Sequence, residues 1–131
     1  KAVNLRAGEK LYDLGAGTGR IIIIAANNFG ARAIGFEIST LFYLVSLFNI
    51  FFHRAKAKVY RRNFYNEDLG KADVIFCFLV PRGLKKLEEK FQSELKPGSR
   101  IISYVFPLPF WKPEKTIEFS KTAKFFLYIK E

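Results

Sequence analysis

The fold of this chain is decided by KLYDLGAGTG, residues 10–19. Its first half is short and mostly apolar, as in a buried β-strand, and three glycines follow at alternate positions. Glycine permits a tight turn and a close approach of the backbone to a ligand. The apolar run from Thr18 to Phe29 then predicts a helix that stops at Gly30. Strand, glycine loop and helix in this order predict a ligand-binding unit of an α/β fold.

Outward from this unit, strand-like and helix-like segments alternate. Four further segments predict parallel strands: ARAIGFE (31–37), KAKVYRRNF (56–64), ADVIFCFLV (72–80) and SRIISYVF (99–106). Helices are predicted from Ser39 to about Arg54 and from Leu84 to Leu95, and KTIEF with KFFLYIK predicts a closing hairpin. We therefore expect one Rossmann-like α/β domain over residues 1–131, with a doubly wound, mostly parallel sheet of about seven strands and a C-terminal antiparallel hairpin.

Composition narrows the class of protein. The chain has 131 residues, 50% of them hydrophobic, which suggests a single folded domain. Its net charge of +10 predicts an anionic partner. Cys77, the single cysteine, lies in an apolar run and is expected to be a buried thiol, and no metal site is expected. No apolar run reaches the roughly 18 residues that cross a membrane.

The glycine loop predicts a cationic ligand. A dinucleotide fingerprint would place its third glycine at position 20, where Arg20 stands. Asp13 precedes the first glycine by two residues and would repel a pyrophosphate at the start of the helix. A carboxylate suits a ligand that carries an ammonium and a sulfonium group. S-adenosylmethionine has both.

Two later positions fit the rest of such a ligand. Glu37 ends the second predicted strand, where a carboxylate can accept hydrogen bonds from both hydroxyls of a ribose. Asn63, Phe64 and Tyr65 follow the third strand, where an amide and an aromatic ring can contact an adenine. The alternatives are a solvated charge for Glu37 and ordinary loop packing for residues 63–65.

The sequence also resembles a known family. DLGAGTGR, with GFEIS downstream and LKPGSRIIS later, resembles class I S-adenosylmethionine-dependent methyltransferases over nearly the whole chain. YDLGAGTGRIIIIAA, ADVIFCFLVP and LEEKFQSELKPGSRIISYVFPLPFW are similar to a small group of protein lysine methyltransferases. That group includes archaeal broad-specificity enzymes and mitochondrial enzymes that act on the ATP synthase c subunit and the adenine nucleotide translocase.

The resemblance implies roles for individual residues. The cofactor-binding residues that it implies are Asp13, Gly15, Ala16, Gly17, Gly19, Glu37, Ile38, Asn63 and Phe64. Phe78 to Pro81 would line the mouth where the methyl group is transferred. Two features depart from the family: a segment before the first strand that helps to close the cofactor site is almost absent, and Phe106 to Glu114 leaves little room for a helix. We therefore expect the domain to lack an N-terminal segment.

An aromatic acceptor mouth is the expected catalytic feature. Methyl transfer requires alignment of nucleophile and methyl group more than acid–base groups. Phe78, Tyr104, Phe106 and Trp111 follow the fourth and fifth strands and can make a dry environment that favours a neutral lysine amine. With Pro81, Phe78 and Tyr104 are the candidate catalytic residues; core packing is the alternative for these aromatic rings. His53, the single histidine, is expected to be a solvated residue at a helix end.

The second predicted helix is unusual. Residues 41–52, LFYLVSLFNIFF, are apolar except for a narrow polar stripe that includes Ser39, Tyr43, Ser46, Asn49 and His53. Five cations follow by residue 62. This pattern suggests a peripheral contact between residues 41–62 and an anionic membrane. The alternative is a helix buried against the sheet beside a solvated basic strand.

These features predict an S-adenosylmethionine-dependent enzyme that methylates a protein lysine. An RNA or other nucleic-acid methyltransferase is the second hypothesis, since the net charge favours it, although Phe78-Leu79-Val80-Pro81 lacks the Asn or Asp with two prolines that base-amine methyltransferases usually carry. A cofactor-binding scaffold without activity is the third. A protein substrate is the expected partner, and the expected location is the cytoplasm, with membrane association.

Overall fold

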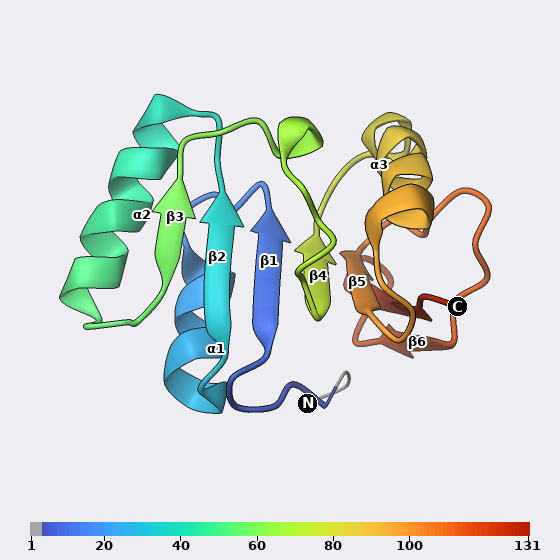
Figure 1. The fold of residues 1–131 in the computed structure, drawn as a ribbon, viewed down its shortest axis with the longest axis horizontal. Coiled ribbons are helices and arrows are strands. Elements are labelled where there is room, and N and C mark those ends of the chain that lie inside the picture. Colours follow the sequence, from blue (N-terminus) through green and yellow to red (C-terminus); the bar gives the residue numbers. More distant parts are fainter. Residues whose placement is uncertain (1–3) are drawn as a thin grey trace.

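The computed structural model describes residues 4–131, which form one seven-stranded sheet covered by helices on both faces (Figure 1). The strands are β1 (Lys10–Leu14), β2 (Arg32–Phe36), β3 (Lys58–Tyr60), β4 (Val74–Cys77), β5 (Arg100–Tyr104), β6 (Lys115–Glu118) and β7 (Lys124–Ile129). Their order is β3-β2-β1-β4-β5-β7-β6; the first five are parallel, and β7 and β6 are antiparallel. The predicted Rossmann-like sheet with a C-terminal hairpin is confirmed.

Three helices connect these strands: α1 (Arg20–Phe29), α2 (Thr40–Phe52) and α3 (Pro81–Glu94). On one face, Ile22 and Ala25 of α1 pack with strand residues such as Val74. On the other face, Leu84 and Phe91 of α3 belong to a second cluster, together with strand residues such as Ile75 and Ile101. The chain reverses its winding direction between β1 and β4, which lie side by side at the centre of the sheet. Ligands of such sheets bind at this point, outside the carboxyl ends of the strands.

Several predicted boundaries were too wide. The fourth strand ends at Cys77, so Phe78, Leu79 and Val80 leave the sheet and lead into α3, which begins at Pro81. Proline is favoured at the first position of a helix because no intrahelical partner is needed there for the missing N–H. The third strand contains only three residues, and a 3₁₀ turn, η1 (Phe64–Asn66), occupies the crossover that follows it in place of a helix.

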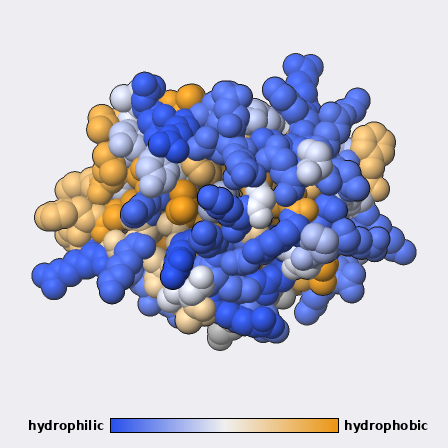
Figure 2. Space-filling model, viewed as in Figure 1, coloured by the Kyte–Doolittle hydropathy of each residue, from blue (hydrophilic) through white to orange (hydrophobic). Residues whose placement is uncertain are grey.

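The helix α2 presents its polar stripe to the protein and most of its large apolar side chains to solvent, while Ile50 packs against the core. Ser39 caps it as predicted, by accepting a hydrogen bond from the Phe42 N–H. Ser46 is its one fully buried residue. Seven large apolar residues on its other sides are 41–82% exposed: Leu41, Phe42, Leu44, Leu47, Phe48, Phe51 and Phe52. Figure 2 shows hydrophobic side chains gathered on the side of the molecule where α2 lies.

Two further findings concern the helices. His53 forms the C-cap of α2, is exposed, and places a ring nitrogen 2.9 Å from the Asn49 carbonyl, which agrees with a residue at a helix end. Within residues 4–131, no helix is both long and apolar enough to cross a membrane.

Candidate cofactor and acceptor site

The strand register brings the predicted site residues into one row. In the sheet, Leu14 pairs with Phe36 of β2 and with Cys77 of β4, and Cys77 pairs with Ser103 of β5. The next residue of each strand is therefore Glu37, Gly15, Phe78 or Tyr104, in this order across the edge. Neighbouring strands are about 4.8 Å apart. A ligand that extends across the edge can therefore reach all four positions.

The glycine loop is built to approach a ligand closely. Gly15, Gly17 and Gly19 have φ angles of 88°, 58° and 85°, in the left-handed region that other residues rarely adopt. A Cβ atom added at Gly15 or Gly17 would meet no atom within 4 Å, so the space above the loop is open. Hydrogen bonds from the Gly15 and Ala16 N–H groups to the Phe36 carbonyl, at 2.9 and 3.0 Å, fix the loop against β2.

Asp13 places a carboxylate beneath this loop. Its side chain is only 3% exposed, and within the described part of the chain no group donates a hydrogen bond to it. Burial, and secondly the charge of Glu37, raise the pKa of Asp13 well above its usual range. A buried carboxylate without a donor is costly unless a cation compensates it. Asp13 therefore favours a cationic ligand.

Glu37 connects the end of β2 to the glycine loop. Its carboxylate accepts hydrogen bonds from the Gly17 N–H at 2.7 Å and from the Ser39 N–H at 3.0 Å. Each oxygen retains a lone pair for a further donor, such as a ribose hydroxyl. Ile38, the next residue, is exposed at the same edge and leaves an apolar surface that a ligand can cover.

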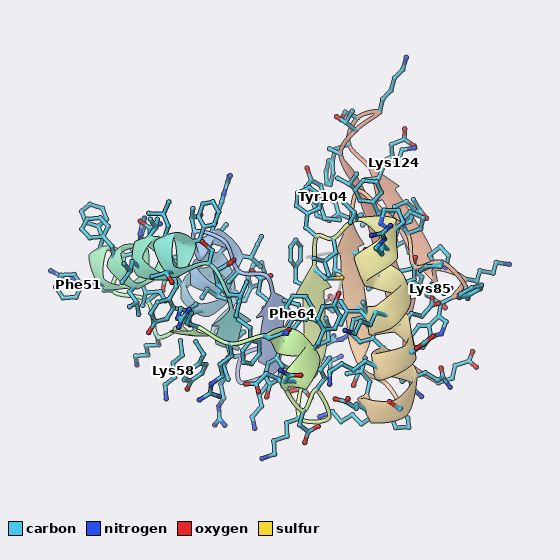
Figure 3. The ribbon with its side chains drawn as sticks, turned by 90° about the horizontal axis from the view of Figure 1, so that it is seen from above. Phe51, Lys58, Phe64, Lys85, Tyr104 and Lys124 are labelled. Atoms are coloured by element: carbon cyan, nitrogen blue, oxygen red, sulfur yellow. The ribbon has the colours of Figure 1, made fainter. Side chains whose placement is uncertain are left out.

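Asn63 and Phe64 lie farther along this edge, at the crossover from β3 to β4. The side chain of Asn63 accepts a hydrogen bond from the Tyr65 N–H at 3.0 Å and so caps η1. Phe64 is half-buried, and its ring lies 4.5 Å from that of Tyr65. Tyr65 is in turn held by a hydrogen bond to the Gly83 carbonyl, so its ring supports Phe64. In the view onto the edge, Phe64 is labelled at η1, of which it is the first residue (Figure 3).

The candidate acceptor residues form an aromatic cluster at the ends of β4 and β5. The rings of Phe78 and Tyr104 are 4.9 Å apart, edge to face. Tyr104 stacks at 4.7 Å on Phe125 of β7, and Lys124 lies beside it in Figure 3. Phe78 is exposed, so its ring forms a free wall of this cluster. Pro81 lies three residues beyond Phe78, exposed at the start of α3.

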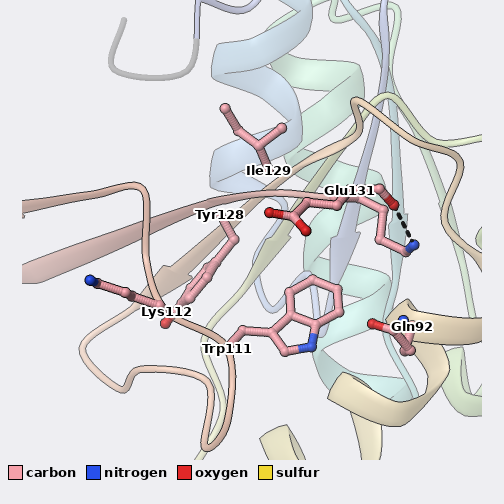
Figure 4. Close-up of a pocket in the computed structure, with 7 residues that line it drawn as sticks. Gln92, Trp111, Lys112, Tyr128, Ile129 and Glu131 are labelled. Carbon is pink, nitrogen blue, oxygen red and sulfur yellow. Dashed lines mark hydrogen bonds between the residues drawn. The ribbon is translucent and has the colours of Figure 1, made fainter.

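Trp111 does not join this cluster, and the expectation that it does was wrong. Glu88 of α3 is buried and accepts hydrogen bonds from the Phe110 and Trp111 N–H groups, which ties residues 107–113 to α3. Trp111 lines a pocket of about 280 Å³ together with Tyr128 and Ile129 (Figure 4). Ile129 pairs with Arg100 at the start of β5, so this pocket lies at the opposite end of the sheet from the glycine loop.

Two functional residues of α2 were missed as parts of the site. The Ser46 hydroxyl donates to the Gly17 carbonyl at 2.6 Å, and the Asn49 amide donates to the Thr18 carbonyl at 2.9 Å. These bonds hold the glycine loop from the side of the helix. The polar stripe of α2 contained the signal: small polar residues on an otherwise apolar helix need polar partners inside the protein.

Cys77 is structural. Its side chain is fully buried, and burial raises the pKa of its thiol to about 12. The thiol therefore stays protonated and unreactive at neutral pH.

The residues present fit S-adenosylmethionine. Asp13 supplies negative charge for an ammonium and a sulfonium group, and Glu37 keeps lone pairs for ribose hydroxyls. The open backbone of Gly15 and Gly17 admits a ligand at close range. Ile38 and Phe64 offer apolar surface beyond Glu37 for a purine. A pyrophosphate would meet two carboxylates at this place instead.

Comparison with known proteins agrees with this arrangement. The model of the ANTKMT methyltransferase domain matches residues 13–115. A protein-lysine N-methyltransferase of Saccharolobus islandicus (strain REY15A) is 37% identical over 111 residues, covering 82% of this chain and 69% of that protein. The adenine nucleotide translocase lysine N-methyltransferase of Mus musculus is 38% identical over 109 residues, covering 79% of this chain and 46% of that protein. The chain thus spans about half the length of the mouse relative.

A solved structure agrees over a longer range. The crystal structure of an RNA methyltransferase from Salinibacter ruber in complex with S-adenosyl-L-homocysteine superimposes with a TM-score of 0.93 at 26% identity, covering 98% of this chain and 84% of that one. S-adenosylmethionine is the cofactor of this fold, and the resemblance read from the sequence is confirmed. The chain belongs to the family of the ANTKMT methyltransferase domain and is an S-adenosylmethionine-dependent methyltransferase domain.

Proposed function

We propose that this domain transfers a methyl group to the side-chain amine of a protein lysine. The observation that carries the proposal is the row of Glu37, Gly15, Phe78 and Tyr104 along one edge of the sheet, with the cofactor residues at one end and an aromatic cluster at the other. The names of the relatives from Saccharolobus islandicus and Mus musculus, both lysine N-methyltransferases, support the choice of acceptor.

Methyl transfer to lysine requires that the amine be aligned with the methyl group and that it be neutral. When bound, the sulfonium supplies a methyl carbon that is already activated toward attack. Phe78 and Tyr104 form an apolar wall beside the approach to this carbon. Converting a lysine ammonium of pKa about 10.4 to the neutral amine at pH 7 costs about 4.6 kcal/mol. An apolar surrounding lowers this cost because it disfavours the charged form.

Asp13 and Glu37 hold the cofactor in this scheme. Both carboxylates lie on the glycine-loop side of the row, toward β2, and the aromatic rings lie toward β5. Charge compensation and acceptor recognition are therefore assigned to different strands. Their separation predicts that substitutions of Glu37 change cofactor affinity, and that substitutions of Tyr104 change acceptor turnover at saturating cofactor.

A labelled-methyl assay tests the proposal. The whole chain is incubated with methyl-labelled S-adenosylmethionine and a protein extract, and the labelled proteins are hydrolysed for amino-acid analysis. We expect label in methylated lysine, and we expect Glu37→Gln to abolish it. Glu118→Gln, at an exposed position of β6, is the matched control and should label fully. Label in other amino acids alone would contradict the lysine acceptor.

RNA methylation is the second candidate function. The net charge of +10 and the likeness to the Salinibacter ruber RNA methyltransferase favour it. The same labelled cofactor offered with total RNA separates the two: label in RNA nucleosides without label in protein would reverse the ranking. We keep protein first because Phe78 to Pro81 contains no polar side chain to read a base edge.

We further propose an anionic membrane surface as a peripheral partner through residues 41–62, and a cytoplasmic location with part of the protein at membranes. Between Glu37 and Glu67 the chain contains five Arg or Lys residues and no acidic one. Cell fractionation with a tagged chain tests the location. Recovery of the protein only in the soluble fraction at low salt would contradict the membrane-associated part.

A further inference from the structure

The outer face of α2, defined as Leu41, Phe42, Leu44, Leu47, Phe48, Phe51 and Phe52, is an apolar surface open to solvent. Phe51 is the most exposed of these residues, at 82%, and in Figure 3 it points away from the sheet at the outer end of the helix. Soluble proteins rarely expose contiguous apolar surface of this kind without a partner for it. Because all seven residues lie on α2, this helix is the element that would contact a partner.

Exposed cations flank this face. Arg54, Lys56 and Lys58 follow the C-terminal end of α2, and Arg61 and Arg62 follow β3. Arg62 pairs with Glu67 at 3.1 Å, whereas none of the first three has an acidic partner within the described residues. An apolar helical face bordered by cations matches the lipid tails and the anionic headgroups of a bilayer surface.

We propose that the outer face of α2 docks on an anionic bilayer with the helix axis parallel to the surface, and that this docking strengthens cofactor binding at the glycine loop. This inference rests on the proposed membrane partner. With 13 residues the helix is about 20 Å long, so it lies on the bilayer. A second copy of the chain fits this face poorly because it would bring the same cations against each other, and each copy carries a net charge of +10.

The link to the cofactor site lies on the inner side of the same helix. Ser46 and Asn49 hold the carbonyls of Gly17 and Thr18, and Glu37 accepts hydrogen bonds from both Gly17 and the N-cap residue Ser39. Most of the apolar surface of α2 gives no stabilisation while it faces water. Lipid that covers this surface stabilises the helix and hence the loop that it holds. Because such coupling is reciprocal, bound cofactor must strengthen lipid binding equally.

Partition onto vesicles tests the surface. The whole chain is sedimented with vesicles of phosphatidylcholine containing 30% phosphatidylglycerol, and with pure phosphatidylcholine. We expect binding to the anionic vesicles that weakens with added salt, and about tenfold weaker binding for Phe51→Ser. Phe110→Ser is the matched control, since Phe110 is 77% exposed on another part of the surface, and should bind as the unchanged chain does. Equal binding by both variants would overturn the docking face.

Calorimetric titration with S-adenosylmethionine tests the coupling. We expect the affinity to rise about fivefold in the presence of anionic vesicles, for the unchanged chain and for Phe110→Ser, and to stay constant for Phe51→Ser. Vesicle binding without a change in affinity would overturn the coupling. Cofactor binding without vesicle binding, or a dimer that depends on Phe51, would overturn the bilayer as occupant and leave the enzymatic function standing. Absence of cofactor binding in all conditions would overturn the enzymatic function itself.

Discussion

The helices α2 and α3 flank the same sheet and have opposite polarity. On α3, Leu84, Leu87 and Phe91 are fully buried against the strands, and lysines such as Lys85 face solvent. On α2, Ser46 is the buried residue, and phenylalanines such as Phe51 face solvent. Burial of apolar surface therefore fixes α3 in the fold, whereas hydrogen bonds to the glycine loop contribute much of what fixes α2.

The two helices therefore have different tasks. The free energy of an apolar helix face is proportional to the area that it removes from water. On α3 the apolar face is buried against the sheet, so its burial stabilises the fold. On α2 the apolar face is exposed, so the free energy of its burial is still available for binding a partner, while the inner side of the helix supports the glycine loop. Changes in α3 should therefore act mainly on stability, and changes in α2 mainly on binding.

The largest expected effect is the contrast between two phenylalanines. Phe91→Ala should lower the free energy of unfolding by about 3–5 kcal/mol, because it leaves a cavity beside the sheet. Phe51→Ala, at an exposed position of α2, should change it by less than about 0.5 kcal/mol. Urea unfolding followed by circular dichroism measures both. Similar losses would show that the outer face of α2 is packed in solution.

A second, smaller effect is expected at Asp13, where stability and binding oppose each other. Asp13→Asn should raise the free energy of unfolding at pH 8 by roughly 1–3 kcal/mol, because it removes a buried carboxylate without a donor. The same change should weaken the binding of S-adenosylmethionine at least tenfold, because the ligand loses the compensating charge. Calorimetry and urea unfolding of the same preparation measure the two effects. A loss in both would mean that Asp13 is structurally paired.

The pH dependence of this variant has a definite sign. The pKa of Asp13 is raised in the folded protein, so the fold holds this proton more tightly than the unfolded chain does. Its contribution to stability is complete below the ordinary aspartate pKa of about 3.9 and is lost as the pH rises through the raised value. The advantage of Asp13→Asn should accordingly be absent at low pH and grow as the pH rises. A constant advantage would assign it to another cause.

The sequence predicted the sheet and the cofactor edge because both depend on local patterns. Apolar strands and the glycine loop of residues 15–19 are visible in the order of residues, and the acid Glu37 follows at the end of a strand. The boundaries of β4 were missed because Phe78 to Val80 continue the apolar pattern of a strand but leave the sheet to reach α3. Apolar character alone cannot distinguish a strand from the rim of a site.

The sequence left the orientation of α2 open between two alternatives, and it placed Trp111 wrongly. An apolar helix is ordinarily turned inward, and only the tertiary contacts of Ser46 and Asn49 with the glycine loop show that this one is turned outward. Trp111 was misplaced because the loop that carries it is fixed by Glu88, 23 residues away in the sequence. Both positions depend on contacts between distant segments, which a local pattern does not contain.

Glu88 provides a third test. It is an inward-facing polar residue of α3 that holds a loop, as Ser46 is on α2. Glu88→Gln should lower the free energy of unfolding by about 1–2 kcal/mol, since it weakens charge-assisted hydrogen bonds to the Phe110 and Trp111 N–H groups. The affinity for S-adenosylmethionine should not change, because that loop lies on the far side of α3 from the glycines. Urea unfolding and calorimetry test both parts. Weaker cofactor binding would show that the contacts of Glu88 also support the glycine loop.

The smallest effect is expected at Ser46, where a single hydrogen bond is removed. Ser46→Ala removes the hydrogen bond to the Gly17 carbonyl and should weaken S-adenosylmethionine binding by about fivefold, equivalent to about 1 kcal/mol. Ser93→Ala on α3 is the matched control, because its exposed hydroxyl bonds only the Lys90 carbonyl of its own helix, and it should bind the cofactor normally. Calorimetry at constant pH resolves this difference. Equal affinities in both variants would mean that the glycine loop keeps its shape without the Ser46 hydroxyl, and that the remaining bonds from Asn49 are enough to hold it.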